Sequence, residues 1–169
     1  MQSISLEKML LTRDERWQIK NRLIRQFQNP VVSITLNIPG PVKDSSLYRR
    51  IHREGMKAFL SRISCRDKVL YHEVFYKPTG PEGYLCIACS GLELKKIGVE
   101  LEEEHPLGRV FDIDVLDHTG VSVNRQNVGR QERKCLICSE SAWVCMRERN
   151  HFLEELLLKI ELLAKTYLT

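Results

Sequence analysis

The sequence has no apolar run of the roughly 18–20 residues that a membrane-spanning helix needs, and no uninterrupted apolar stretch typical of a secretory signal. We therefore expect a cytoplasmic protein without a membrane partner. The sequence also lacks internal repeats, low-complexity tracts and long linkers, which argues against solenoids and disordered chains. Its 169 residues, 43% of them hydrophobic, suit a single domain over residues 1–169.

The chain also has little net charge and few aromatic residues. The 26 Lys and Arg residues against 22 Asp and Glu residues leave a formal net charge of only +4, whereas duplex-binding domains usually carry a dense basic stripe. Aromatic residues make up 7% of the chain, too few for the stacking platforms of single-strand binders. We therefore expect no nucleic-acid partner, while a phosphorylated small molecule or an acidic protein would suit this balance.

The pattern of caps, breakers and apolar periodicity predicts an α+β domain. Strands are expected at residues 31–37, 69–76, 83–89, 109–116 and 121–124. Helices are expected from a capping box at Thr12, from Ser45, from Ser90 to Pro106, and from about Ala142 onward. The order β-α-β-β-α-β-β with added N- and C-terminal helices predicts a mixed or antiparallel sheet of split βαβ or nucleotidyltransferase-like type, with helices packed on one face of it.

Asp112 and Asp114 are the most informative acidic residues. They are one residue apart in an expected strand, so both carboxylates project from one face of the sheet. Carboxylates this close repel each other unless a cation lies between them. Mg²⁺ accepts one or two protein carboxylates and fills its other positions with water and phosphate oxygens. The pair thus favours metal-assisted phosphoryl or nucleotidyl transfer, although two aspartates on the solvated face of a strand would have the same spacing.

Several charged residues near this pair are candidates for the same site. Arg109 is close enough in sequence to neutralise a phosphate, and Glu102 is a candidate general base or further ligand. Other basic residues lie beside loops, where ligand-binding groups are often found. These candidate phosphate-binding residues are Lys43, Arg49, Arg50, Arg133 and Arg147.

The six cysteines are expected to be reduced thiols or metal ligands, because disulfides are rare in the cytoplasm. Cys135 and Cys138 have the spacing of a zinc knuckle, and Cys145 with His151 would complete a tetrahedral Cys3His site for structural Zn²⁺. The irregular gaps and the helix expected from Ala142 weigh against this site. The alternative is a set of packing cysteines beside a basic phosphate-binding segment.

A second Cys-x2-Cys pair, Cys86 and Cys89, offers a four-sulfur alternative with Cys135 and Cys138. On a strand, however, positions i and i+3 face opposite sides, so the two thiols are poor joint ligands. Buried packing is therefore the interpretation that we favour for Cys86 and Cys89, and also for Cys65.

With these residues in view, the chain resembles the apo-citrate lyase phosphoribosyl-dephospho-CoA transferase family over nearly its whole length. The segments that carry the resemblance, in chain order, are Arg13-Asp-Glu-Arg16, Pro39-Gly-Pro-Val-Lys-Asp44 with Arg49-Arg50, Gly80-Pro-Glu-Gly83, Glu100-Leu-Glu102, His105-Pro-Leu-Gly-Arg109 with Asp112-Ile-Asp114, and Arg133-Lys-Cys-Leu-Ile-Cys138 with Cys145, Arg147 and His151. Each segment alone is weak, but their order and spacing together are specific.

The resemblance implies transfer of a prosthetic group from 2′-(5″-triphosphoribosyl)-3′-dephospho-CoA to a serine of the citrate lyase acyl carrier (gamma) subunit, with release of pyrophosphate. It also implies that Asp112 and Asp114 bind Mg²⁺, while basic residues bind the departing phosphates. Two alternatives are a nucleotidyltransferase with another acceptor and a zinc-stabilised binding module without catalytic activity.

Overall fold

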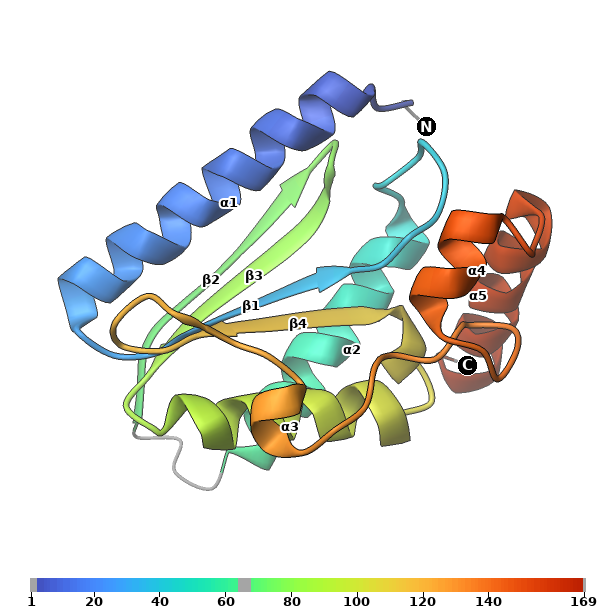
Figure 1. Cartoon of the computed structure of the whole chain (residues 1–169). Helices are drawn as coiled ribbons and strands as arrows, with labels where there is room; N and C mark the ends of the chain where they lie inside the picture. Colours follow the sequence, from blue (N-terminus) through green and yellow to red (C-terminus); the bar gives the residue numbers. More distant parts are fainter. Residues whose placement is uncertain (1–2, 64–67, 169) are drawn as a thin grey trace.

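The structure, a computed structural model, describes residues 3–63 and 68–168 and contains one five-stranded antiparallel sheet (Figure 1). The strands are β1 (Val31–Leu36), β2 (Val69–Lys77), β3 (Gly80–Ile87), β4 (Phe111–Leu116) and β5 (Ser122–Val123), in the order β2-β3-β1-β4-β5. β1 and β2 are joined through a helix and separated by β3, which is antiparallel to both. This arrangement is typical of a split βαβ unit, and every pair in the sheet is antiparallel rather than mixed.

Helices cover both faces of the sheet rather than the single face expected (Figure 1). They are α1 (Leu6–Phe27), α2 (Ser46–Arg62), α3 (Gly91–Glu104), α4 (Ala142–Glu148) and α5 (Leu153–Tyr167), with short 3-10 turns η2 (Gly108–Val110) and η3 (Gln126–Val128). In Figure 1, α2 and α3 lie against one face, α1 runs along the other, and α4 and α5 stand together at one end. Both faces are covered because the apolar residues of α1 pack on the side opposite α2 and α3. The α+β class and the expected order of helices and strands up to β5 are confirmed.

Two clusters of buried side chains hold these layers together. The larger contains residues of α2, α3 and α5 against the inward side of the strands, including Phe59, Ile113 and Ile160. The smaller lies under α1, where Leu23 and Ile24 pack among buried residues of β1, β3 and β4. The middle of α1, residues 13–20, instead faces polar side chains of β1 and β4.

The helix ends differ from the sequence predictions in two places. α1 begins at Leu6, where the Ser5 side chain caps the helix, and not at Thr12. Thr12 is buried inside the helix and donates its hydroxyl to the Lys8 carbonyl, 2.8 Å away. The Thr12–Glu15 pattern was therefore wrong as a start signal, because a cap-like spacing inside a helix is satisfied by the helix itself.

The C-terminal segment forms two helices instead of the one expected from Ala142. α4 ends where Arg149 adopts a left-handed conformation (φ 55°), and α5 starts at Leu153. Shorter differences affect the strands: β4 starts at Phe111 after the η2 turn, and β3 starts at Gly80 rather than residue 83.

Candidate active site

Asp112 and Asp114 lie on the same face of β4, as their spacing predicts, and this face looks toward α1. Their cross-strand partners on β1 are both hydroxyl residues, Thr35 opposite Asp112 and Ser33 opposite Asp114. The Thr35 hydroxyl donates to Asp112 Oδ2 at 3.2 Å. The two carboxylates are about half exposed, 47% and 57% of their side-chain surface, so they remain open to a ligand.

A cleft of about 440 Å³ separates this polar stripe from the middle of α1, residues 13–20. The helix contributes all the cations of the cleft and one carboxylate, Asp14, whereas the sheet contributes the aspartate pair and the hydroxyls. The residues that line it are Arg13, Asp14, Arg16, Trp17, Lys20, Ser33, Thr35, Asp112 and Asp114. Lys20 Nζ lies 3.9 Å from Asp114 Oδ2, a weak contact that leaves room for a different partner. The cleft therefore combines paired carboxylates with a basic wall, which suits a metal-bound polyphosphate.

Glu82 on β3 supports this basic wall and was missed by the sequence analysis. Its side chain is fully buried and accepts from Arg16 Nε at 2.9 Å, from Lys77 Nζ at 3.1 Å and from the Tyr84 hydroxyl at 3.0 Å. Burial first, and then the Glu82 carboxylate, raise the pKa of Tyr84, which keeps it a neutral donor. Glu82 belongs to the segment Gly80-Pro-Glu-Gly83, whose glycines and proline are typical of a turn. The sequence therefore did not indicate that this segment is part of a strand, or that its glutamate faces α1.

Glu102, the candidate general base, is buried at the outer edge of β4. One oxygen accepts from the Ile113 backbone N–H at 2.9 Å, and the carboxylate pairs with Arg125 and Arg133, each at 2.6 Å. Lys95, also buried, donates to the Ile113 carbonyl at 2.7 Å. Because β5 pairs only with Val115 and Leu116, Ile113 has no strand partner on this edge. The Glu102 and Lys95 side chains bind its backbone N–H and carbonyl instead. The Glu102 carboxylate is engaged by its partners at this edge, and Glu102 does not line the Asp112–Asp114 cleft.

Among the predicted phosphate-binding residues, Arg133 comes closest to the aspartate pair. Its guanidinium is 3.7 Å from Asp112 Oδ1 and bridges this carboxylate to Glu102. Lys43 belongs to the loop before α2, where burial and the neighbouring Arg16 lower its pKa, and it donates to the Ile38 carbonyl. Arg133 therefore contacts one aspartate of the pair, whereas Lys43 does not line the cleft.

The other three predicted phosphate-binding residues are engaged elsewhere. Arg49 forms a two-pronged ion pair with Asp44 (Nε to Oδ1, 2.8 Å) and stacks on Tyr76. Arg50 donates to the Leu168 carbonyl at 2.8 Å, near the end of the chain. Arg147 stacks on Trp143, with its Cζ 5.2 Å from the ring centroid, an ordinary cation–π separation. The structure does not bring these three residues to the cleft lining.

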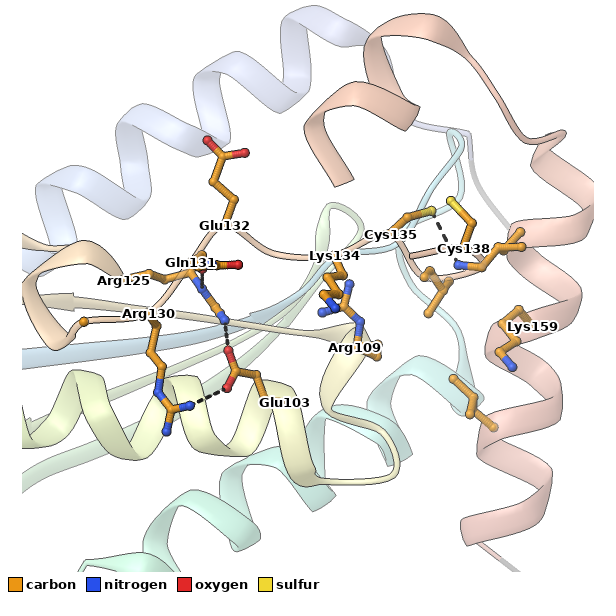
Figure 2. Close-up of a pocket in the computed structure, with 14 residues that line it drawn as sticks. Glu103, Arg109, Arg125, Arg130, Gln131, Glu132, Lys134, Cys135, Cys138 and Lys159 are labelled. Carbon is orange, nitrogen blue, oxygen red and sulfur yellow. Dashed lines mark hydrogen bonds and ion pairs between the residues drawn. The ribbon is translucent and has the colours of Figure 1, made fainter. Parts of the chain in front are cut away.

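Arg109 lines a second and larger cavity, of about 760 Å³, beside the Cys135 loop (Figure 2). Burial, followed by the nearby Arg133 and Arg125, lowers the pKa of Arg109. Figure 2 shows Arg125 and Arg130 reaching the Glu103 carboxylate, while the Cys135 loop and α5 form the opposite wall. Arg109 is thus placed at a basic cavity, and not in the aspartate cleft.

The four residues of the predicted Cys3His site come together. The ligand atoms of Cys135, Cys138, Cys145 and His151 all lie within 4.8 Å of one another. Cys138 Sγ is 3.4 Å from Cys145 Sγ and 3.3 Å from His151 Nε2. With Zn–S bonds near 2.3 Å, tetrahedral ligands would be separated by about 3.5–4 Å, so this cluster has the size and donor set of a metal site.

The break between α4 and α5 explains why the cluster forms. A continuous helix would carry His151 away from Cys145, whereas the left-handed Arg149 ends α4 and allows the chain to turn back. Cys86 is buried in β3 and Cys89 packs against the main core, and neither belongs to the cluster. Their predicted packing role agrees with these positions, while Cys65 lies outside the described residues.

Within residues 3–63 and 68–168, no helix has both the length and the apolar character that crossing a bilayer requires.

Comparison with known proteins relates almost the entire chain to one family. The model of the apo-citrate lyase phosphoribosyl-dephospho-CoA transferase family matches residues 4–167. A protein of this name from Citrobacter koseri is 38% identical over 162 residues, which is 95% of this chain and 88% of the relative. Proteins of the same name from Escherichia coli O1:K1 and Shigella boydii serotype 18 are 37% identical over the same shares of both chains. The match includes both the aspartate cleft and the Cys3His cluster.

Proposed function

This chain belongs to the apo-citrate lyase phosphoribosyl-dephospho-CoA transferase family, and we propose that it performs the transfer in the cleft between α1 and the sheet. It is a transferase that attaches the phosphoribosyl-dephospho-CoA group to apo-citrate lyase. The observation that carries the location is the placement of Asp112 and Asp114 on one face of β4, opposite the cations of α1.

We propose 2′-(5″-triphosphoribosyl)-3′-dephospho-CoA as the donor and a serine of the acyl carrier subunit as the acceptor. The serine oxygen forms a bond to the α-phosphorus, and the bond from this phosphorus to the bridging α–β oxygen breaks. Pyrophosphate leaves with that electron pair, and the hydroxyl proton passes to water at the open cleft. The protein forms no covalent bond in this reaction, so it contributes mainly positioning and charge stabilisation.

Asp112 and Asp114 fit the Mg²⁺ that this chemistry implies. They are two half-exposed carboxylates on one face, and their present cationic contacts, at 3.7 and 3.9 Å, are long. When bound there, Mg²⁺ would neutralise charge on the phosphates of the donor. The Thr35 hydroxyl fixes the orientation of Asp112 through its 3.2 Å hydrogen bond.

The basic residues around the pair have distinct roles in this proposal. Arg16 and Lys20 extend from α1 into the cleft and would bind the pyrophosphate portion of the donor. Arg133 balances charge beside Asp112, and Glu102 holds the Arg133 guanidinium in place at 2.6 Å. We therefore assign Glu102 a positioning role, because its carboxylate is already shared among two arginines and a backbone N–H.

We propose that the Cys3His cluster binds Zn²⁺ as a structural ion. Three thiolates and an imidazole leave no open position in a tetrahedral site, which is typical of structural rather than catalytic zinc. The ion would connect the 135–138 loop, which lines the larger cavity, to α4 and to the segment just before α5.

We further propose that residues 1–169 act as one cytoplasmic transferase domain of nucleotidyltransferase-like type. The donor and the acyl carrier subunit would be its partners. An excess of four positive charges would favour an acidic carrier surface.

Mass spectrometry of the apo-carrier subunit tests the proposal. After incubation with the protein, the donor and Mg²⁺, the carrier should gain the mass of one phosphoribosyl-dephospho-CoA group. Asp112→Asn and Asp114→Asn should slow this gain by more than about 100-fold while circular dichroism stays unchanged. Glu7→Gln, an equal loss of charge at an exposed position of α1, is the matched control. Wild-type rates for both aspartate variants would refute the site.

A further inference from the structure

The larger cavity, beside the Cys135 loop, contains cations that the transfer site does not use. Arg109, Lys134 and Lys159 enter it from the turn after α3, the loop before α4 and α5, respectively (Figure 2). Among the residues that the structure describes, none of the three forms an ion pair with a carboxylate, whereas Arg125 and Arg130 are paired with Glu103. Two carboxylates also line the cavity, but Glu103 is paired with Arg125 and Arg130, and Glu132 accepts from the Ser141 hydroxyl at 3.0 Å. The three cations without an ion-pair partner come from separate elements and share one cavity, which indicates a site for an anion.

The cavity also has an apolar side. Leu136, Ile137 and Leu163 line it together with the three cations, and Ile137 is 40% exposed. Its volume of about 760 Å³ lies within the range of small-molecule sites. A ligand with both a phosphate group and a flat or aliphatic part would match this lining, because each part would find a suitable wall.

The cavity is close to the aspartate cleft, because two short segments of the chain, 109–112 and 133–134, each reach both sites. Arg109 and Asp112 are three residues apart, so their Cα atoms are at most about 11 Å from each other. Lys134 forms an extended bridge with Ser141, and successive side chains of extended backbone point to opposite sides. Accordingly, Arg133 reaches Asp112 while the next residue, Lys134, lines the cavity.

We propose that this cavity binds the 5′-diphosphate of the dephospho-CoA portion of the donor. The inference rests on the proposed function, because that donor carries two phosphate groups separated by two ribose rings. One ligand with two such groups needs two anion sites near each other. The triphosphate would lie in the aspartate cleft, the 5′-diphosphate would contact Arg109, Lys134 and Lys159, and the apolar side would hold the adenine or the pantetheine arm.

Calorimetric titration with 3′-dephospho-CoA, which has the diphosphate but no triphosphoribosyl group, tests this site. The wild-type protein should bind it, and Lys134→Gln and Lys159→Gln should each raise the dissociation constant by about tenfold. Lys57→Gln removes a positive charge from an exposed lysine of α2 and should leave binding unchanged, as should Asp114→Asn. Inorganic tripolyphosphate with Mg²⁺ should show the reverse pattern, with loss of affinity in Asp114→Asn only.

Unchanged affinity for 3′-dephospho-CoA in both lysine variants, or absence of binding by the wild-type protein, would overturn the proposal. These outcomes are distinguishable from failure of the proposed function. If the carrier gains its prosthetic group while the lysine variants bind 3′-dephospho-CoA normally, the transfer stands and the second site is wrong. If 3′-dephospho-CoA binds as expected but the carrier gains no mass, the binding site stands and the transfer is wrong.

Discussion

Glu82 is a carboxylate without solvent exposure, and its charge is compensated by Arg16, Lys77 and the Tyr84 hydroxyl. A buried ion pair contributes little net stability when complete, but losing one partner is costly because the other charge is left uncompensated. Glu82 therefore holds Arg16 over the sheet, and through Arg16 it shapes the basic wall of the cleft.

We expect Glu82→Gln to lower the free energy of unfolding by about 2–3 kcal/mol, because Arg16 and Lys77 would lose their shared carboxylate. The transfer rate should fall as well, since Arg16 would no longer be fixed beside the cleft. Urea denaturation and the carrier mass assay measure the two effects. Glu73→Gln, at an exposed position of β2, is the control. A Glu82→Gln protein with wild-type stability and rate would contradict the role of Glu82.

At the scale of elements, the turn from α3 to β4 depends on Gly108. A Cβ atom at this position would overlap the Leu101 carbonyl oxygen and lie 2.8 Å from the Glu102 carbonyl oxygen. Both obstacles are backbone atoms of α3, so they cannot rotate away. The absence of a side chain at Gly108 therefore allows the η2 turn to stay tight and places Arg109 next to the end of α3.

Gly108→Ala should lower the free energy of unfolding by about 2 kcal/mol, the scale of overpacking in a close contact. Chemical denaturation followed by circular dichroism measures it. At Gly129 a Cβ atom would meet no heavy atom within 4 Å, and φ is 68°, so Gly129→Asn, which tolerates that backbone, should have a much smaller effect. Equal stability of the Gly108→Ala and wild-type proteins would show that the turn can widen freely.

The C-terminal elements are joined by the Cys3His cluster rather than by a continuous helix. Purified protein should contain about one zinc ion per chain by elemental analysis, and Cys138→Ser should lose it. Removal of the ion by a strong chelator should lower the melting temperature by about 5 °C or more, because the metal binds the folded arrangement and not the unfolded chain. Cys89→Ser, outside the cluster, should retain its zinc. Protein purified without zinc and with an unchanged melting temperature after chelation would rule out a structural ion.

At the scale of the whole molecule, His52 links the stability of the core to pH. It is fully buried on α2, and its Nε2–H donates to the Ile34 carbonyl at 2.9 Å. Burial lowers the pKa of His52 below the usual 6.5, an effect that exceeds the opposing influence of the Ile34 hydrogen bond and Glu82. Below about pH 6.5 the unfolded chain therefore binds a proton that the folded protein does not, and stability falls as the pH decreases.

We expect the urea midpoint to be lower at pH 5.5 than at pH 7.5, and His52→Gln to reduce this difference. Glutamine keeps a side-chain N–H donor for the Ile34 carbonyl but does not titrate in this range. The exposed His72→Gln should preserve the wild-type difference between the two pH values. The same pH dependence in His52→Gln as in the wild-type protein would exclude this histidine as its source.

The order of the elements up to β5, the shared face of Asp112 and Asp114, and the Cys3His set as one of two alternatives could all be predicted from the sequence. Each of these depends on local rules: alternation along a strand, turn residues, and the types of side chain that bind metals. Local rules failed at Thr12 and at the break between α4 and α5, because a cap-like pattern is ambiguous and Arg149 carries no turn signal of its own.

Which charged side chains meet follows from the packing of the elements and could not be predicted from the sequence. Glu102 and Asp112 are ten residues apart, yet one faces the edge of β4 and the other faces α1, and Arg133 connects them from a distant loop. Similarly, Arg16 meets Glu82 across 66 positions of the chain. Electrostatic partners separated this far in sequence are selected by the packing of α1 and α3 on the sheet, and no local pattern contains that information.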